Sequence, residues 1–180
     1  KEVKLIMPDV KTNLLIKVSM ISIILLLTVN SVAVGANTAS QDITVSVEPI
    51  NEISVTGTVN LNINTSSAGI SAGDGTFTVT DSSSTMSYTT NESSKKITAA
   101  LDGTFNNITF MVNVTSSSAT SEGDVPLSVT DVDVITGLGN ASDTGETITY
   151  TAEAQPNTAP NADGGGETNT ITFTLTDAGI

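Results

Sequence analysis

Four aspartates in the second half of the chain could hold a metal ion. Asp131 and Asp133 are two residues apart in the run TDVDV, so they point to the same face of a strand. With Asp124 or Asp143 they could bind calcium through carboxylate oxygens. However, the chain has no EF-hand loop or glycine-rich calcium repeat, and with 17 acidic residues from residue 37 onward some fall two apart by chance. We expect an acidic solvent-facing surface here and assign no metal ligand.

The chain lacks the residues on which most catalytic sites depend. It contains no histidine, cysteine, arginine or tryptophan, so no histidine can act as the base for a serine nucleophile. Lys95 and Lys96 could activate a serine, but they lie in the polar stretch TNESSKK without a surrounding motif. Paired carboxylates of the glycosidase kind work in a cleft, and Tyr88, Tyr150 and four phenylalanines are few for sugar stacking. We expect no catalytic residue, no cofactor and no enzyme activity.

Five Asn-x-Ser/Thr sequences are possible acceptors of surface glycans in an exported protein, although chance matches are expected in a chain so rich in Ser and Thr. Asn91 and Asn140 lie in expected loops and are the better candidates. Asn107 and Asn113 are expected on the polar face of a strand, where they are equally explained as surface residues. Asn64 is the fifth.

Residues 1–36 have the pattern of a secretory signal peptide. Four lysines precede an uncharged run over residues 18–36, VSMISIILLLTVNSVAVGA, which ends in small residues. Its densest part, residues 20–29, is short for a membrane span of about 20 apolar residues. We expect cleavage after Ala36 or Ala39. A retained hydrophobic anchor and a pilin-like assembly helix are the alternatives.

The part expected to be exported is strongly acidic. Only Lys95 and Lys96 oppose its 17 acidic residues, so its charge is about −15. Such a surface repels the phosphates of nucleic acids and of anionic lipids, so we expect no binding to nucleic acid, and none to a membrane after cleavage.

Apolar and polar residues alternate along most of the exported part, as in strands with one face on a core. The longest such stretch, residues 41–63, divides at Pro49 and is interrupted at Gly57, where we expect a bulge or bend. Residues 108–114 predict a strand beside this stretch. Pro126 lies in the run over residues 125–129, and because proline cannot donate a backbone hydrogen bond, we expect an edge strand or a bulge there. Further strands are expected over residues 76–80, 86–88, 97–101, 125–129, 132–135, 147–154 and 168–176.

The segments between these runs are rich in turn residues. We expect a turn at residues 81–84, a hairpin-like connection at 90–96, loops at 65–75, 115–123 and 137–145, and an exposed Pro/Gly-rich loop at 155–166 that is the best candidate for disorder. About nine strands and no helical period after residue 36 predict one all-β domain over residues 37–180. We expect an antiparallel β-sandwich, Ig-like or jelly-roll-like, with a closed β-barrel as the alternative.

Three runs, ITVSVEPINEISVTGTVNLNI, YTTNESSKKITAAL and the closing ITFTLTDA, together with the signal peptide, resemble secreted Ser/Thr-rich all-β surface proteins of bacteria and archaea, which are mostly of unassigned function. More loosely, the chain is similar to subunits of TasA-like fibres and donor-strand pilins. That resemblance implies a filament in which the N-terminal strand of one subunit completes the sheet of the next.

Residues 37–47 are the segment that such a mechanism would use. They alternate, begin at the expected cleavage site and are separated by Pro49 from the next strand, so they could pair within their own domain or with a neighbour. We therefore expect a secreted or cell-surface structural protein that forms a homopolymer by strand pairing. The alternative is a monomeric adhesion module that binds carbohydrate or depends on calcium.

Overall fold

The structure, a computed structural model, describes residues 37–161 and 165–179. Within these ranges it contains nine strands and no helix, and the strands form two separate antiparallel sheets. The predicted β-sandwich is thus confirmed, and the alternative of a closed barrel is wrong. The strands are β1 (Asn51–Thr56), β2 (Phe77–Thr90), β3 (Lys95–Leu101), β4 (Ile108–Val114), β5 (Thr120–Ser121), β6 (Val125–Pro126), β7 (Val132–Leu138), β8 (Ala141–Ala154) and β9 (Ile171–Asp177).

Two predicted features include residues outside the described ranges. The signal segment at residues 1–36 is one, and residues 162–164 of the Pro/Gly-rich loop are the other. A search of the described residues found no helix long and apolar enough to cross a membrane. The compact unit of the fold begins at Ser46.

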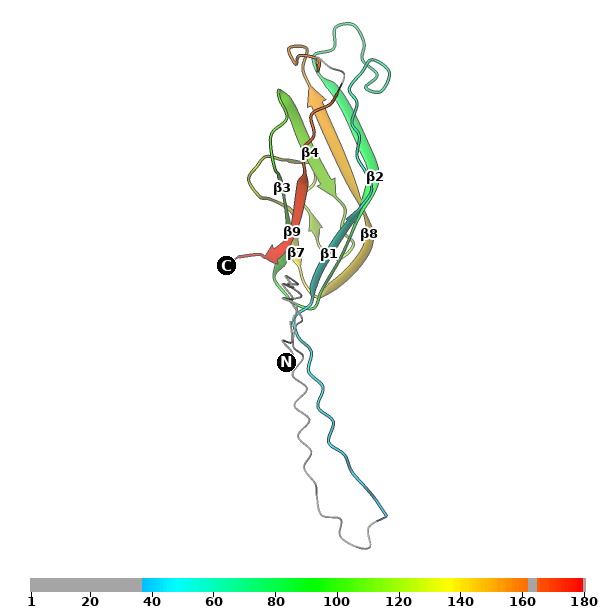
Figure 1. The fold of residues 1–180 in the computed structure, drawn as a ribbon, viewed down its shortest axis with the longest axis vertical. Coiled ribbons are helices and arrows are strands. Elements are labelled where there is room, and N and C mark those ends of the chain that lie inside the picture. Colours follow the sequence, from blue (N-terminus) through cyan, green and yellow to red (C-terminus); the bar gives the residue numbers. More distant parts are fainter. Residues whose placement is uncertain (1–36, 162–164, 180) are drawn as a thin grey trace, which may run out of the picture. The chain divides into compact units, whose positions relative to one another are not determined.

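One sheet has the strand order β1-β2-β8-β4-β6, and the other has the order β5-β7-β3-β9. Figure 1 shows β2 and β8 as the two long strands of the domain, and each has 14 residues. The connection at residues 90–96 is not a hairpin, because β2 and β3 belong to different sheets. β4 pairs with β8 and β6, so the prediction that it lies beside the opening stretch is wrong.

The core lies between the two sheets and is built from alternate residues of the central strands. Met86 of β2 and Ile148 of β8 are fully buried on one side, and Ile97 of β3 and Ile135 of β7 are fully buried on the other. Burying each of these side chains contributes about 1.5–3 kcal/mol. Within a single sheet, these side chains would be exposed on one face. Packing the second sheet against that face completes the core.

A β-bulge replaces the turn predicted at residues 81–84. β2 continues through this segment, and its register against β8 shifts between Asp81 and Ser84. Before the shift the odd-numbered residues of β2, such as Phe77, face inward. After the shift the even-numbered residues, such as Met86, face inward. A bulge and a turn both interrupt the alternation, and the sequence alone did not separate them.

The loop predicted at residues 137–145 is also mostly strand. β7 ends at Leu138 and β8 begins at Ala141, so only Gly139 and Asn140 connect the two strands. Because β7 and β8 lie in different sheets, this short connection ties one face of the sandwich directly to the other.

β1 ends at Thr56, so the chain leaves the sheet at Gly57, where a bulge or bend within a longer strand was expected. Gly57 has φ of 112°, which favours glycine, and a Cβ atom there would lie 2.5 Å from Oγ of Ser84. Beyond it, Val59, Leu61 and Ile63 alternate with exposed asparagines and pack against the core without joining either sheet. The longest alternating stretch, residues 41–63, therefore contributes only one six-residue strand.

Candidate functional site

The four aspartates considered as calcium ligands have separate environments. Asp131 is exposed just before β7, and Asp133 lies within β7 with its carboxylate 2.8 Å from Nζ of Lys96. Asp124 accepts a 3.0 Å hydrogen bond from Nδ2 of Asn113. Among the described residues, no three acidic side chains gather as metal ligands would.

Asp143 instead belongs to a polar cluster that sequence reasoning missed. Tyr88 of β2 donates a 2.5 Å hydrogen bond to the Asp143 carboxylate, which also accepts from the backbone N–H and hydroxyl of Ser118. Glu146 accepts hydrogen bonds from Thr115 and from both donors of Ser117. The two carboxylates thus fix residues 115–118 to β8, which is a structural role.

These contacts shift the pKa of each group. Partial burial acts to raise the pKa of Asp143 and of Glu146, but the hydrogen bonds from Tyr88 and the serines outweigh it and hold both carboxyl pKa values below their ordinary range. Burial, with the hydrogen bond to Asp143, raises the pKa of Tyr88 to about 12. The cluster therefore favours ionised carboxylates beside a protonated tyrosine, and neither carboxylate is set up to act as an acid.

Lys95 and Lys96, the two lysines considered as bases for a serine, both form ion pairs. Nζ of Lys95 lies 2.9 Å from Glu92 and 2.5 Å from Asp177. The pair with Asp177 joins the start of β3 to the end of β9, and Lys96 is paired with Asp133 of β7.

Residues 41–47, which we call the arm, are outside every strand of the described structure. Ile43, Val45 and Val47 are 80%, 82% and 76% exposed. Residues 38–50 contain no turn or bend and are exposed throughout. An extended segment with three exposed β-branched residues at alternate positions has the pattern of a strand that lacks a partner.

Asn91 holds the root of the arm. Its Nδ2 donates to the carbonyl of Glu48 at 2.8 Å, its Oδ1 accepts from N of Ile50 at 2.8 Å, and its backbone N–H donates to the carbonyl of Ile50 at 3.2 Å. These three bonds tie residues 48–50 to the connection between β2 and β3.

The two sides of the sandwich differ in their edge strands. On one side the edges are β5 and β6, with two residues each, and Pro126 lies in β6 as predicted for an edge. On the other side the edges are β1 and β9, with six and seven residues. Short, proline-containing edges resist further pairing, whereas long edges invite it.

A hollow of about 500 Å³, which we call the seam, separates the two long edges. Ile53 and Val55 of β1 line it on one side together with Val59, and Ile171 and Phe173 of β9 line it on the other. All five are only partly buried or exposed. The seam thus places apolar side chains, with polar ones among them, between two unpaired strand edges.

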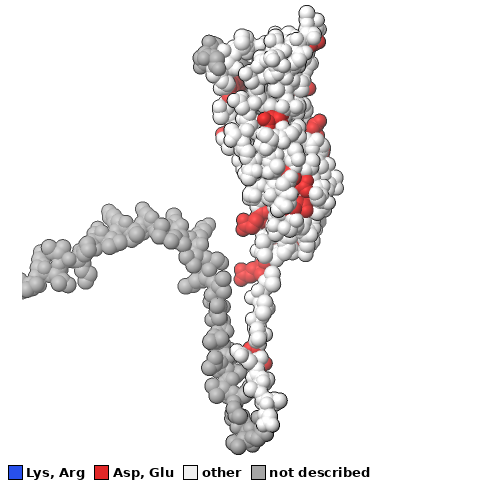
Figure 2. Space-filling model, turned by 90° about the vertical axis from the view of Figure 1, so that its right-hand side faces the viewer, with Lys and Arg blue, Asp and Glu red and all other residues white. Residues whose placement is uncertain are grey.

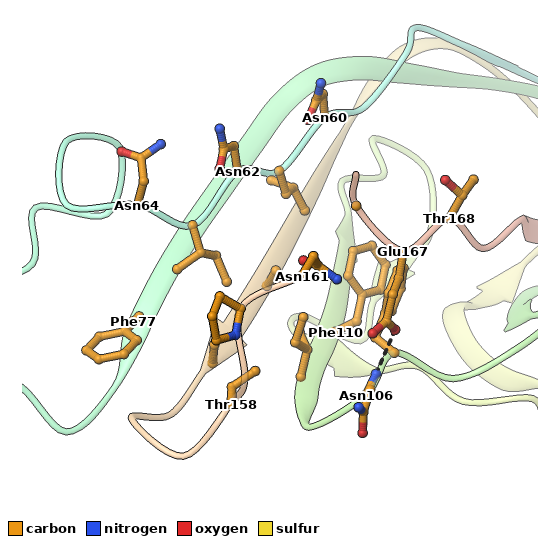
Figure 3. Close-up of a pocket in the computed structure, with 18 of the residues that line it drawn as sticks. Asn60, Asn62, Asn64, Phe77, Asn106, Phe110, Thr158, Asn161, Glu167 and Thr168 are labelled. Atoms are coloured by element: carbon orange, nitrogen blue, oxygen red, sulfur yellow. Dashed lines mark hydrogen bonds between the residues drawn. The ribbon is translucent and has the colours of Figure 1, made fainter. Parts of the chain in front are cut away.

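A larger pocket of about 1030 Å³ lies at the end of the sandwich where residues 59–65 meet residues 155–161 and 165–169. The rings of Phe105 and Phe110 are 5.2 Å apart on its wall. Figure 3 shows Asn60, Asn62 and Asn64 along one segment, and Glu167 accepting a 2.8 Å hydrogen bond from the backbone N–H of Asn106. Figure 3 also shows the side chains of Asn60, Asn62 and Asn64 on the outer side of that segment, and no lysine of the described residues belongs to the lining of the pocket.

The five glycan candidates differ in how free their side chains are. Asn140 is exposed between β7 and β8, whereas the Asn91 amide holds the arm root. Asn113 bonds to Asp124, and Asn64 accepts from the N–H groups of Ser66 and Ser67. Asn107 is not on a strand face as predicted, because it occupies a turn with φ of 55°. Asn140 is therefore the most accessible of the two better candidates.

Figure 2 shows one face of the molecule, on which acidic side chains are scattered among uncharged ones and no lysine or arginine is visible. Comparisons of the chain with protein-family models, with curated proteins and with solved structures gave no match. The arm, the two long edges and the pocket are the features of the described residues that can support a function.

Proposed function

We propose that this protein is an exported, non-enzymatic structural subunit that assembles with copies of itself at the cell surface or outside the cell, by pairing the arm of one copy with a sheet edge of the next. The observation that carries the proposal is the exposure of Ile43, Val45 and Val47 on an extended segment. Burying each of these side chains would contribute about 1.5–3 kcal/mol, and strand pairing would satisfy the backbone of the arm.

Two further features support assembly into a filament. An arm and an edge are different surfaces, so a contact between them is heterologous and continues from copy to copy. The acidic, Ser/Thr-rich surface would keep such an assembly soluble and discourage lateral aggregation.

Electron microscopy of cells expressing the full chain, and of their medium, tests this function. The unmodified chain is expected to give filaments. A variant with Ile43, Val45 and Val47 each changed to Ser is expected to give none. The matched control changes Thr44 and Ser46 to Ala, which alters only the polar face of the same arm, and it should assemble normally. Filaments of normal length from the triple variant would refute the role of the arm.

The pocket at the end of the sandwich favours a second candidate, a carbohydrate-binding adhesion module. Its aromatic wall and polar residues such as Thr158 and Asn161 suit an uncharged, hydroxyl-rich ligand, and no cation of the described residues belongs to its lining. Calorimetric titration with neutral oligosaccharides tests this, with Phe105→Ala expected to abolish the heat of binding and Phe173→Ala, which is outside the lining, to preserve it. Dispersed particles that bind a glycan would support this candidate over the filament.

A further inference from the structure

We infer that β9 is the edge that receives the arm, so that residues 41–47 of one copy pair with Ile171–Asp177 of a second copy and cover the seam. This inference rests on the proposed function and names its acceptor. Four observations about β9 and β1 lead to it.

The first observation is the direction of the backbone groups of β9. The carbonyl of Thr170 accepts from N of Asp102, and N of Ala178 donates to the carbonyl of Ser94, so the even-numbered positions hydrogen-bond to β3. In an antiparallel pair the intervening residues direct their N–H and C=O groups the other way. Ile171, Phe173 and Leu175 therefore present their backbone groups to the open side, where no strand of the described chain pairs with them.

The second observation is the match of side chains between β9 and the arm. Ile171, Phe173 and Leu175 are only partly buried, and they alternate with Thr172, Thr174 and Thr176. The arm has the same length of seven residues and the same alternation. Paired with β9, its three apolar residues would lie over the seam, and Thr44 and Ser46 would join the row of threonines. Cross-strand pairs of threonine and serine are favourable.

The third observation is that β1 is a poorer acceptor. It has six residues against the seven of β9, and its alternating face carries two apolar residues, Ile53 and Val55, where β9 carries three.

The fourth observation concerns charge. The outward face of β1 carries Glu52, and the arm carries Asp42 and is followed by Glu48. Like charges on adjacent strands oppose pairing, and the Thr172–Thr176 face of β9 has no such charge.

Cysteine cross-linking tests the acceptor, because the natural chain has no cysteine. Two full-length copies with different tags are expressed together, one with Thr44→Cys and the other with Thr174→Cys, and are treated with a short bis-maleimide. The short reagent reaches both the directly opposite and the diagonal position, so the test does not depend on strand direction. The control partner is Thr109→Cys, an exposed threonine on β4 of the other sheet.

A product that carries both tags is expected with Thr174→Cys, in at least tenfold excess over the control with Thr109→Cys. A chain carrying Thr44→Cys and Thr174→Cys together, diluted among unmodified copies, is expected to give no internal cross-link. Normal filaments without the mixed product would overturn β9 as acceptor and leave the proposed function standing. An internal cross-link would overturn pairing between copies. The mixed product without filaments would uphold β9 and refute the filament.

Discussion

The side-chain amide of Asn91 donates a 2.8 Å hydrogen bond to the carbonyl of Glu48, 43 residues earlier in the chain. Through this bond the connection between β2 and β3 holds the residue that directly follows the arm. The same asparagine belongs to an Asn-x-Ser sequence, so its two possible roles must be separated by experiment.

Replacing Asn91 by Ala should weaken assembly. The root loses two side-chain hydrogen bonds, so the free energy of unfolding is expected to fall by about 1–2 kcal/mol and filament yield to fall with it. Ser93→Ala is the control, because it removes the glycan acceptor sequence and keeps the amide. If Ser93→Ala reduces assembly as much as Asn91→Ala, the amide is not the cause.

Gly57→Ala should destabilise the domain. The added Cβ would meet Oγ of Ser84 at 2.5 Å, and alanine is strained at a φ of 112°, so we expect a loss of about 1–3 kcal/mol in urea unfolding. Gly73→Ala is the matched variant, since Gly73 also has a positive φ but has no atom within 4 Å of the added Cβ. Equal losses at the two positions would show that the contact with Ser84 is unimportant.

The two tyrosines should respond differently to loss of the hydroxyl. Tyr88→Phe removes a hydrogen bond to an ionised carboxylate, and a loss of about 1.5–3 kcal/mol is expected. Tyr150 is equally buried, but within the described residues no hydrogen bond reaches its hydroxyl, so Tyr150→Phe should change the unfolding free energy by less than about 0.5 kcal/mol. Similar losses in the two variants would contradict the role of the Tyr88–Asp143 bond.

Acid should weaken the domain through Asp143 and Glu146. Their pKa values are lowered in the folded chain, so their contribution is fully present above the unfolded values of about 4 and is lost as the pH falls through the folded values. Thermal unfolding between about pH 7 and pH 3 should therefore show a smaller decline in Tm for a variant with Asp143→Asn and Glu146→Gln. Asp131→Asn removes an exposed charge outside the cluster, so the Tm of this variant should decline with pH as much as the Tm of the unmodified chain.

The polar cluster shows why part of the structure was beyond a reading of the sequence. Asp143 and Glu146 are three residues apart, so a simple period of two puts them on opposite faces of a strand. The register of β2 against β8 shifts next to them, near Gly145 with its φ of 72°, and both carboxylates turn inward. A shift of this kind depends on the partner strand, and the sequence of one strand does not reveal it.

Strands with strict alternation were predictable, because their own residues define the buried face. β4 matches its predicted range of residues 108–114, and β9 falls within the predicted range of 168–176 apart from its last residue. The assignment of strands to sheets was not predictable, since it depends on contacts between distant segments. The alternation over residues 41–47 likewise indicated a strand, but it contained no information about which chain supplies the partner.

The unequal sides of the sandwich limit how many neighbours one copy can have. The side with β5, β6 and Pro126 offers no long edge, so if the arm pairs with β9 as we propose, a copy carries one arm and one receiving edge. A subunit with a valence of two and unlike ends forms unbranched chains with a direction. One terminus of each chain would expose a vacant seam and the other an unused arm, so a single truncated copy without its arm would occupy the vacant seam and stop growth from that terminus.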